Sequence, residues 1–244
     1  MKHTVHQTMQ FRWLVVTGDS KSPTAWDWDR GEPPVRSMQP VREPIRSARQ
    51  RHIAALAFSQ TTDSFHLLES GLEHDLFRML DRDPEVEWIV AQPLELAVTG
   101  DENFRHIPDL LVLNRAGQVT VWDARPEARR DARFNRATAA TAKACSKVGW
   151  NYATFAGIST VQRLNELWLH CSRVAPSWLG TFEGEILEAV AGGPSTLGAL
   201  FDLAGGDPRS KACVWHLIWR GDLCVDLSAQ IQESTMVARV SHDA

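Results

Sequence analysis

Apolar residues recur at steps of three and four positions over residues 64–81, and this spacing predicts the first clear helix of the chain. Pro84 would end it, because proline cannot continue a helix. Glu69 and Glu73 lie four positions apart, so we expect them to share one side of the helix. That side borders the apolar stripe, from where a carboxylate can reach a cleft at the edge of the core.

Strand patterns follow the helix. Residues 86–98 alternate in parts, and Pro93 within them implies an edge strand or a break. Residues 107–113 and 119–124 alternate as well, and the stretch 114–118 between them contains the polar and glycine residues of a tight turn. We therefore predict a β-hairpin made by these two strands.

Alternation also decides which side chains of the hairpin share a face. Asp109 precedes apolar residues on one face of the first strand, and Asp123 and Arg125 end an apolar face of the second. Charged groups at the end of an apolar strand face are unusual for a pure core strand. We expect Asp123 and Arg125 to lie close to the end of the partner strand that carries Asp109.

A second helix is predicted over residues 127–148, followed by a short strand over 150–155 and a third helix over 159–173. The second helix is basic, and its outer face could either bind nucleic-acid phosphates or simply be solvated. The order helix, hairpin, helix, strand predicts an α/β fold with a mixed sheet. The basic residues of this segment are Arg129, Arg130, Arg133, Arg136, Lys143 and Lys147.

The pattern changes after Pro176. Three short helices are expected over residues 182–190, 195–204 and 209–220, followed by a strand over 223–227. Three helices with a terminal strand are typical of a winged-helix or helix-turn-helix module. The last helix has apolar tryptophans where a DNA-reading helix has varied polar residues, so we favour protein contact over major-groove reading for it.

Three regions are predicted: an N-terminal arm over 1–60, a nuclease-like domain over 61–176 and a winged-helix-like domain over 177–244. The arm prediction rests on residues 30–52, which hold six arginines against two glutamates and are rich in proline. Such a composition favours an extended basic segment over a packed element. It could contact a partner or be a solvated linker.

Composition narrows the class of protein. The 244 residues include 26 basic and 30 acidic ones, a formal charge of −4, which excludes a histone-like protein that binds through bulk positive charge. Four separated cysteines without a C-x-x-C pair argue against a structural zinc site or a disulfide framework, and we expect them to be buried and reduced. No signal peptide or spanning segment is visible, so we expect a soluble, cytoplasmic protein.

The candidate chemistry lies in Glu73, the segment His106-Ile-Pro-Asp109, and the segment from Asp123 to Arg125. A helix carboxylate, a strand carboxylate and a carboxylate-x-cation pair on the next strand have the layout of the P-D…(D/E)-x-K nuclease core. Hydrolysis of a phosphodiester needs an activated water and neutralised charge, which one or two Mg²⁺ ions on hard oxygen ligands supply. Alternatively, Asp109 ends a strand and Asp123 forms a surface pair with Arg125.

Several stretches also resemble the TnsA-type endonuclease subunit of heteromeric transposases. They are spread in the family's order from about residue 65 to 237: "LLESGLEHDLFRMLDRDPEVEWIVAQPLEL", "RHIPDLLVLNRAGQVTVWDARPEAR", "ACSKVGWNYATF", "HLIWRGDLCVDLS" and "STMV". The resemblance implies a restriction-endonuclease-like fold that nicks double-stranded DNA at transposon ends. It also implies a DDE-type transposase subunit as partner, and a regulatory ATPase as a further candidate partner.

The resemblance implies roles for individual residues. Glu73, Asp109 and Asp123 match the metal-binding positions for Mg²⁺, for which Mn²⁺ would substitute, and Arg125 matches the cation position. His106 matches a histidine that often precedes the P-D pair, and Glu69 matches a second acidic position in some relatives.

The sequence departs from the family pattern at Arg125, where lysine is usual. Arginine stays protonated at physiological pH, so it can offset developing charge but cannot act as a general base. Two alternatives to a transposon-end nuclease therefore stay open. One is a weak or inactive nuclease-fold protein that serves as a DNA-binding adaptor, and the other is a stand-alone defence nuclease.

Overall fold

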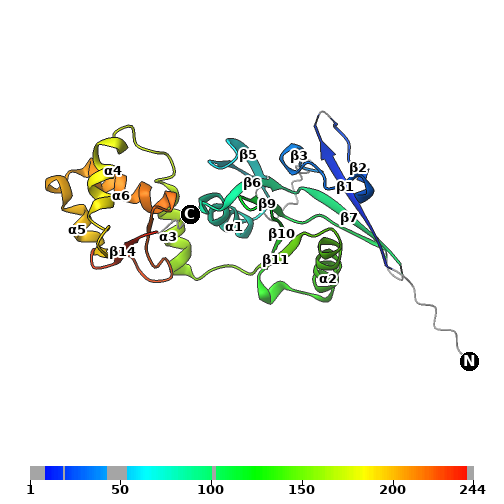
Figure 1. Cartoon of the computed structure of the whole chain (residues 1–244). Coiled ribbons are helices and arrows are strands. Elements are labelled where there is room, and N and C mark those ends of the chain that lie inside the picture. Colours follow the sequence, from blue (N-terminus) through cyan, green and yellow to red (C-terminus); the bar gives the residue numbers. More distant parts are fainter. Residues whose placement is uncertain (1–8, 19, 43–53, 101–102, 241–244) are drawn as a thin grey trace, which may run out of the picture. The chain divides into compact units, whose positions relative to one another are not determined.

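The structure is a computed structural model that describes residues 9–18, 20–42, 54–100 and 103–240 (Figure 1). It is a mixed α/β protein, with several antiparallel or mixed sheets and six α-helices in these residues. The chain divides into two compact units. The first contains residues up to Phe77 and Glu85–Gly157, and the second contains Arg78–Pro84 and the residues from Ile158 onward. In the described residues, no helix is both long and apolar enough to cross a membrane.

The centre of the first unit is a four-stranded sheet in the order β11-β10-β9-β6. Strands β6 (Val86–Ala91), β9 (Leu110–Asn114) and β10 (Val119–Ala124) are antiparallel neighbours, while β11 (Asn151–Phe155) is parallel to β10. The predicted hairpin and the predicted fourth strand are thus confirmed. The parallel pair needs a crossover connection, which is helix α2 (Ala132–Lys147).

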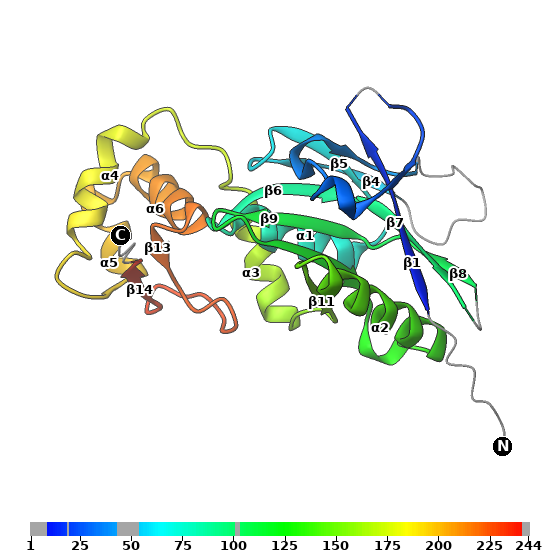
Figure 2. The same ribbon diagram turned by 45° about the vertical axis from the view of Figure 1, so that its right-hand side comes forward.

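A second sheet has the order β2-β1-β7-β8, with β3 also paired to β1. Figure 2 shows its strands beside the four-stranded sheet. Apolar side chains of both sheets and of α2 form one core, which includes Trp13, Leu96, Leu111, Val121 and Ala144. The strands are β1 (Gln10–Thr17), β2 (Thr24–Trp26), β3 (Met38–Gln39), β7 (Leu94–Thr99) and β8 (Phe104–His106).

The prediction of an extended arm over residues 1–60 is wrong for much of that segment. Strand β1 pairs with β7 over six residues, and Val35 and Met38 are buried in the same core. Two short 3-10 turns, η1 (Trp28–Arg30) and η2 (Val35–Ser37), connect these strands. The prolines and arginines suggested an unpacked segment, but the interspersed apolar residues are enough to anchor it. Residues 43–53 of the predicted arm lie outside the described residues.

The helix predicted over residues 64–81 is half wrong. Its first part is strand β5 (Ser64–Leu68), which pairs with β4 (Ala55–Ser59) in a hairpin, and helix α1 runs only over Gly71–Arg82. Five residues are too few to separate a period of two from one of 3.6. Residues 64–68 form a strand because they pair with β4, and β4 lies in the segment that was predicted to be the arm.

Helix α2 begins later than predicted, because Asp131 accepts a hydrogen bond from the Phe134 N–H group and caps it. Residues 127–129 form a separate 3-10 turn, η3 (Glu127–Arg129), so Arg129 and Arg130 precede the helix. Ala137, Ala140 and Ala144 pack inward, whereas the other four predicted basic residues are exposed on the helix: Arg133, Arg136, Lys143 and Lys147.

The second unit contains α3 (Thr160–His170), α4 (Leu179–Glu188), α5 (Leu197–Phe201) and α6 (Pro208–Arg220). A small antiparallel sheet has the order β12-β14-β13, and a 3-10 turn, η4 (Leu203–Gly206), precedes α6. The two units divide after Gly157, so α3 belongs to the second unit. The boundary predicted at residue 176 had assigned this helix to the nuclease-like domain. The strands are β12 (Ser195–Thr196), β13 (Leu223–Cys224) and β14 (Met236–Arg239).

The cysteines are only partly as predicted. Cys145 and Cys213 are buried free thiols, but Cys171 and Cys224 are exposed. Burial raises the pKa of the Cys145 thiol to about 12, which keeps it protonated and unreactive at neutral pH.

Candidate active site

Asp109 and Asp123 lie opposite each other at the ends of β9 and β10. The register pairs Val121 with Leu111 and Trp122 with Leu110, so one further step places the two aspartates side by side. The Asp109 N–H group donates to the Trp122 carbonyl over 3.0 Å, and the Ala124 N–H group donates to Asp109 Oδ2 over 2.6 Å. The shared face predicted from alternation is therefore confirmed.

Glu73 lies in the first turn of α1 and is 6% exposed. Its N–H group donates to Ser70 Oγ over 3.2 Å, and its carboxylate accepts bonds from Ser70 Oγ and from the Glu69 N–H group, both over 2.8 Å. These bonds satisfy donors at the helix start, as in a capping box. Glu69 precedes the helix, so the prediction that both glutamates share one helical face is wrong.

The charges of Glu73 and Asp123 act on Asp109. Burial raises the pKa of Asp109 well above its usual value, and the negative charges of Glu73 and Asp123 raise it further. Burial also raises the pKa of Glu73, against the lowering effect of its bonds to Glu69 and Ser70. Segments more than 30 residues apart in sequence thus bring three acidic groups to one place, with Asp109 in the middle.

Asp123 is 2% exposed, and both of its carboxylate oxygens are engaged. His106 Nε2 lies 2.8 and 3.0 Å from the two oxygens, and the Tyr152 hydroxyl donates to Oδ2 over 2.5 Å. Burial, followed by the charge of Asp123, raises the pKa of Tyr152, which stays a neutral donor. Tyr152 was not predicted as a site residue, although it is the only tyrosine of the chain and lies in the predicted strand after the basic helix.

The donor types fit Mg²⁺, but a complete protein cage is not formed. Within the part of the chain that the structure describes, no group of three or more His, Cys, Asp or Glu side chains is arranged to hold a metal ion. Asp109 Oδ1 accepts no hydrogen bond from the described residues, and Glu73 is its acidic neighbour. Mg²⁺ is commonly held by one or two carboxylates together with substrate phosphates, and Glu73 with Asp109 matches that mode. Each Glu73 oxygen accepts one hydrogen bond and keeps a lone pair for a metal ion, whereas Asp123 Oδ2 already has two partners, so Asp123 fits a supporting position better than the predicted ligand position.

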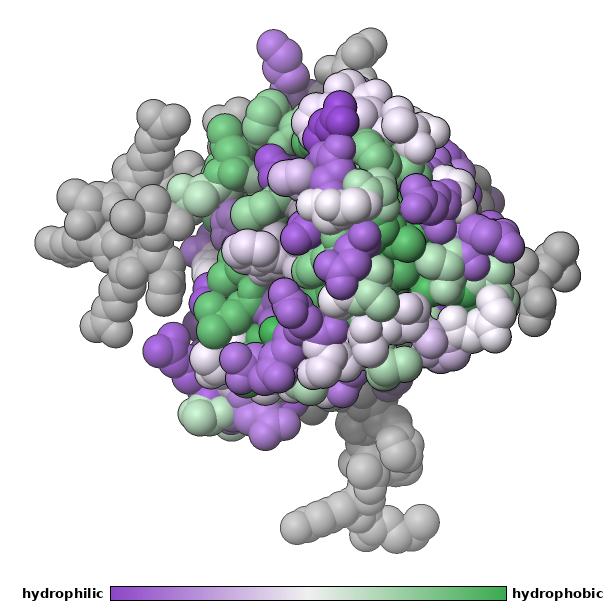
Figure 3. All heavy atoms as spheres, turned by 90° about the vertical axis from the view of Figure 1, so that its left-hand side faces the viewer, coloured by the Kyte–Doolittle hydropathy of each residue, from purple (hydrophilic) through white to green (hydrophobic). Residues whose placement is uncertain are grey.

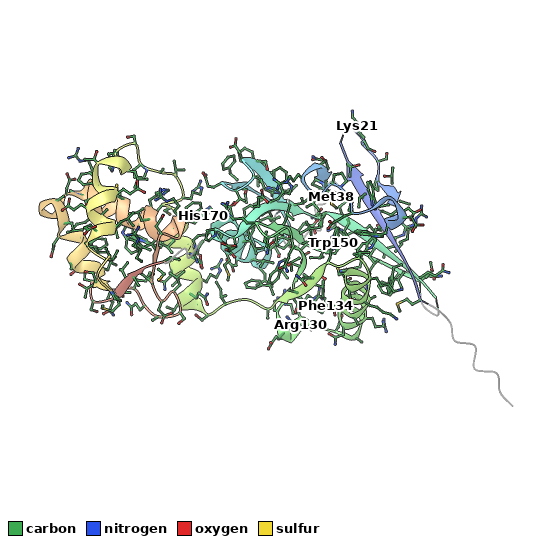
Figure 4. All side chains as sticks on the ribbon, in the orientation of Figure 1. Lys21, Met38, Arg130, Phe134, Trp150 and His170 are labelled. Carbon is green, nitrogen blue, oxygen red and sulfur yellow. The ribbon has the colours of Figure 1, made fainter. Side chains whose placement is uncertain are left out.

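Arg125 does not face the acidic groups. It is exposed, its Nε donates to the Arg129 carbonyl over 2.9 Å, and its guanidinium lies 5.6 Å from the centre of the Phe134 ring. Arg130 lies over the same ring at 5.9 Å, and Figure 4 shows Arg130 and Phe134 at one end of α2. In the described residues Arg125 forms no ion pair with a carboxylate, so a surface pair with Asp123 is excluded.

A basic groove lies beside the acidic groups in the first unit. Its volume is about 690 Å³. His106 lines it and also contacts Asp123, so the groove adjoins the buried carboxylate of Asp123. Of the predicted DNA-binding residues, Arg133 and Arg136 line the groove, whereas Lys147 lies over the Phe11 ring at 5.0 Å. The groove residues come from β8, the end of β10 and the start of α2: Asn103, Phe104, Arg105, His106, Arg125, Asp131, Arg133, Phe134, Arg136 and Ala137.

Comparisons with known proteins assign no family. No protein-family model matches the chain, and a search of the curated proteins finds no match. The resemblance seen in the motifs stays a prediction.

Proposed function

We propose that this protein is a metal-dependent DNA endonuclease and acts as the TnsA-like cutting subunit of a heteromeric transposase. The observation that carries the proposal is the electrostatic coupling of Asp109 to Glu73 and Asp123. Negative charges that raise the pKa of a neighbouring buried carboxyl are costly for the fold, and such clusters are typical of functional sites. A cation that neutralises them offers a physical reason for their presence.

In the proposed reaction, Glu73 and Asp109 would be the residues that hold Mg²⁺, and substrate phosphates would complete its ligands. The bound ion would activate a water molecule and offset the charge that develops on the phosphate. Asp123 and Tyr152 keep the His106 ring at the edge of the groove, next to the phosphodiester. The Ala124 N–H bond fixes one oxygen of Asp109, which orients the other.

The basic groove supports double-stranded DNA as substrate. Arg105, Arg125 and Arg133 are exposed, and all three line the groove. Arginine forks match phosphate oxygens well, and each neutralised phosphate releases counterions. The net charge of −4 does not oppose this, because the contact depends on the local charge of the groove.

The arrangement of elements also supports the proposal. A mixed sheet with an antiparallel hairpin, a crossover helix and a parallel strand is compatible with a restriction-endonuclease-like domain. In the second unit, the order α4-β12-α5-α6-β13-β14 and the sheet order β12-β14-β13 are compatible with a winged-helix-like domain. Both assignments belong to the proposal.

A protein partner is proposed for the second unit. Trp168 is 59% exposed, and it lies edge-on to Trp215 in an apolar pocket of about 440 Å³ that Leu164 and Phe201 also line. Figure 3 shows one face of the molecule on which hydrophobic residues reach the surface among hydrophilic ones. The transposase subunit or a regulatory ATPase would be the partner.

A DNA-binding adaptor that does not cut is the second candidate function. It is favoured by Arg125, which occupies the usual lysine position and is bound to the Arg129 carbonyl. A stand-alone defence nuclease would differ from the main proposal by the absence of a transposase gene beside this one.

A plasmid-nicking assay separates these functions. Supercoiled plasmid is incubated with Mn²⁺ and the protein, with and without the product of the neighbouring gene. We expect nicking by the wild type and its loss in Asp109→Asn. Asp29→Asn is the matched control, because it removes the same charge from an exposed position in the same unit. Equal nicking by Asp109→Asn and wild type would place the active site elsewhere, and no nicking under any condition would favour the adaptor.

A further inference from the structure

The acidic groups of the site lack the cation that was predicted for them. Arg125 is directed to the Arg129 carbonyl and the Phe134 ring. A phosphate that approaches Asp109 and Glu73 meets negative charge, and a positive side chain beside them would favour both its binding and its cleavage. Another residue of the first unit has this position.

Arg42 is that residue. Its Nη2 donates to Glu69 Oε2 over 2.5 Å, and Glu69 is adjacent to the start of α1 and to Glu73. The Glu69 N–H group donates to Glu73 Oε2 over 2.8 Å, so the residue that pairs with Arg42 also contacts the Glu73 carboxylate. Although Arg42 is 27 positions before Glu69 in sequence, the two residues form an ion pair beside the start of α1.

Gln92 holds Arg42 in place. Its Oε1 accepts a bond from Arg42 Nε over 3.4 Å, and its side chain is 4% exposed. Its carbonyl accepts from the Val41 N–H group over 2.9 Å, and its N–H group donates to the Asp109 carbonyl over 2.8 Å. One residue therefore connects the segment of Arg42 to the strand end of Asp109.

The backbone of Gln92 is strained, which supports a special role for it. Its φ is +48°, a left-handed conformation that non-glycine residues seldom adopt. Strain of this kind persists where the surrounding structure over-determines it, and it is frequent at functional sites. Here the two backbone bonds and the Arg42 contact hold the conformation.

We propose that Arg42 is a catalytic residue that binds the scissile phosphate next to Asp109 and Glu73, and that Gln92 is its positioning residue. The inference rests on the proposed function and names the group that recognises the phosphate at that site. The side chain of Arg42 is 47% exposed, and two of its five N–H donors are used in the contacts above. The other three have no partner among the described residues, and we propose that they bind phosphate oxygens.

Arg42→Ala and Arg42→Lys test the proposal, with Arg36→Ala as control. Arg36 comes from the same segment, is 56% exposed and pairs with Glu87 over 2.6 Å, away from the acidic groups. Fluorescence anisotropy with a labelled duplex in Ca²⁺ measures binding without cleavage, and plasmid nicking in Mn²⁺ measures the rate. Thermal unfolding shows whether each variant is folded.

We expect Arg42→Ala to nick roughly 100-fold more slowly, the loss typical of a removed transition-state donor. Arg42→Lys should recover part of the rate, because it keeps the charge but loses the fork. The slope of log affinity against log salt should fall by about 0.9 in Arg42→Ala, as for one lost phosphate contact. Arg36→Ala should leave the rate, the slope and the unfolding temperature unchanged.

A double-mutant cycle tests the role of Gln92. If Gln92 acts through Arg42, Gln92→Ala slows nicking in the wild-type background and has no further effect in Arg42→Ala. If Gln92→Ala slows nicking by the same factor in the wild-type and Arg42→Ala backgrounds, Gln92 does not act through Arg42, and the positioning role is overturned.

Other outcomes overturn the role of Arg42. Faster nicking by Arg42→Ala would show that Arg42 blocks the site, and unchanged nicking with an unchanged salt slope would show that it does not touch the phosphate. A third result separates the two proposals. If neither the wild type nor Arg36→Ala nicks the plasmid, but the slope of log affinity against log salt is still smaller in Arg42→Ala, the proposed nuclease function fails and the contact between Arg42 and a phosphate stands.

Discussion

Removing the charge of Asp109 should stabilise the fold at neutral pH. Asp109 is partly buried, and its carboxylate faces the negative charges of Glu73 and Asp123. Asparagine is nearly isosteric with aspartate, and its amide oxygen can still accept the bond from the Ala124 N–H group. Asp109→Asn therefore removes an unfavourable charge and keeps the hydrogen bond.

The pH dependence follows from the direction of the pKa shift. Because the pKa of Asp109 is higher in the folded than in the unfolded protein, the folded state holds the proton more tightly. The resulting stability is fully present below the unfolded pKa and is lost as the pH rises through the folded pKa. The advantage of Asp109→Asn should therefore be small at pH 3.5 and largest at pH 8.

The magnitude is about 1–3 kcal/mol at pH 8, the usual cost of a buried polar group that is poorly satisfied. For a unit of this size, 1 kcal/mol shifts the unfolding temperature by about 2–4 °C. Thermal unfolding of wild type, Asp109→Asn and the exposed control Asp29→Asn, followed by circular dichroism from pH 3.5 to 8, measures the difference. A destabilised Asp109→Asn variant, or a gain that does not depend on pH, would refute the reasoning.

Three further predictions concern the neighbouring contacts. Tyr152→Phe removes the hydroxyl bond to the buried Asp123 and should lower the free energy of unfolding by about 1.5–3 kcal/mol in urea denaturation; an unchanged midpoint would contradict that bond. Arg133→Ala should lower the salt slope of duplex binding by about 0.9 in anisotropy, whereas the exposed Lys21→Ala should not change it; equal slopes would remove Arg133 from the interface. Ser70→Ala should cost about 1 kcal/mol of stability, since Ser70 caps α1, and no loss in the same denaturation series would contradict the cap.

The part of the site that sequence could predict is local. Asp109 and Asp123 lie on one hairpin with a short turn, so alternation alone places them on the same face. The start of α3 is local as well, since Ser159, where this helix was predicted to begin, accepts a bond from the Gln162 N–H group three positions later.

The missed parts depend on long-range pairing. Tyr152 reaches Asp123 because β11 is parallel to β10, and that pairing leaves no signal in the spacing of either strand. Arg42 reaches Glu69 through a segment whose proline and arginine content suggested an unpacked arm. Strand β5 was mistaken for the start of a helix for the same reason, since its partner strand β4 was not identified.

The central claim is that Asp109, with Glu73, holds a divalent ion together with DNA. Calorimetric titration of Mn²⁺ into the protein bound to an uncleavable DNA duplex measures this directly. The account predicts a saturable isotherm for the wild type and for Asp29→Asn, and its loss in Asp109→Asn. The same Mn²⁺ affinity and stoichiometry in Asp109→Asn as in the wild type would contradict it.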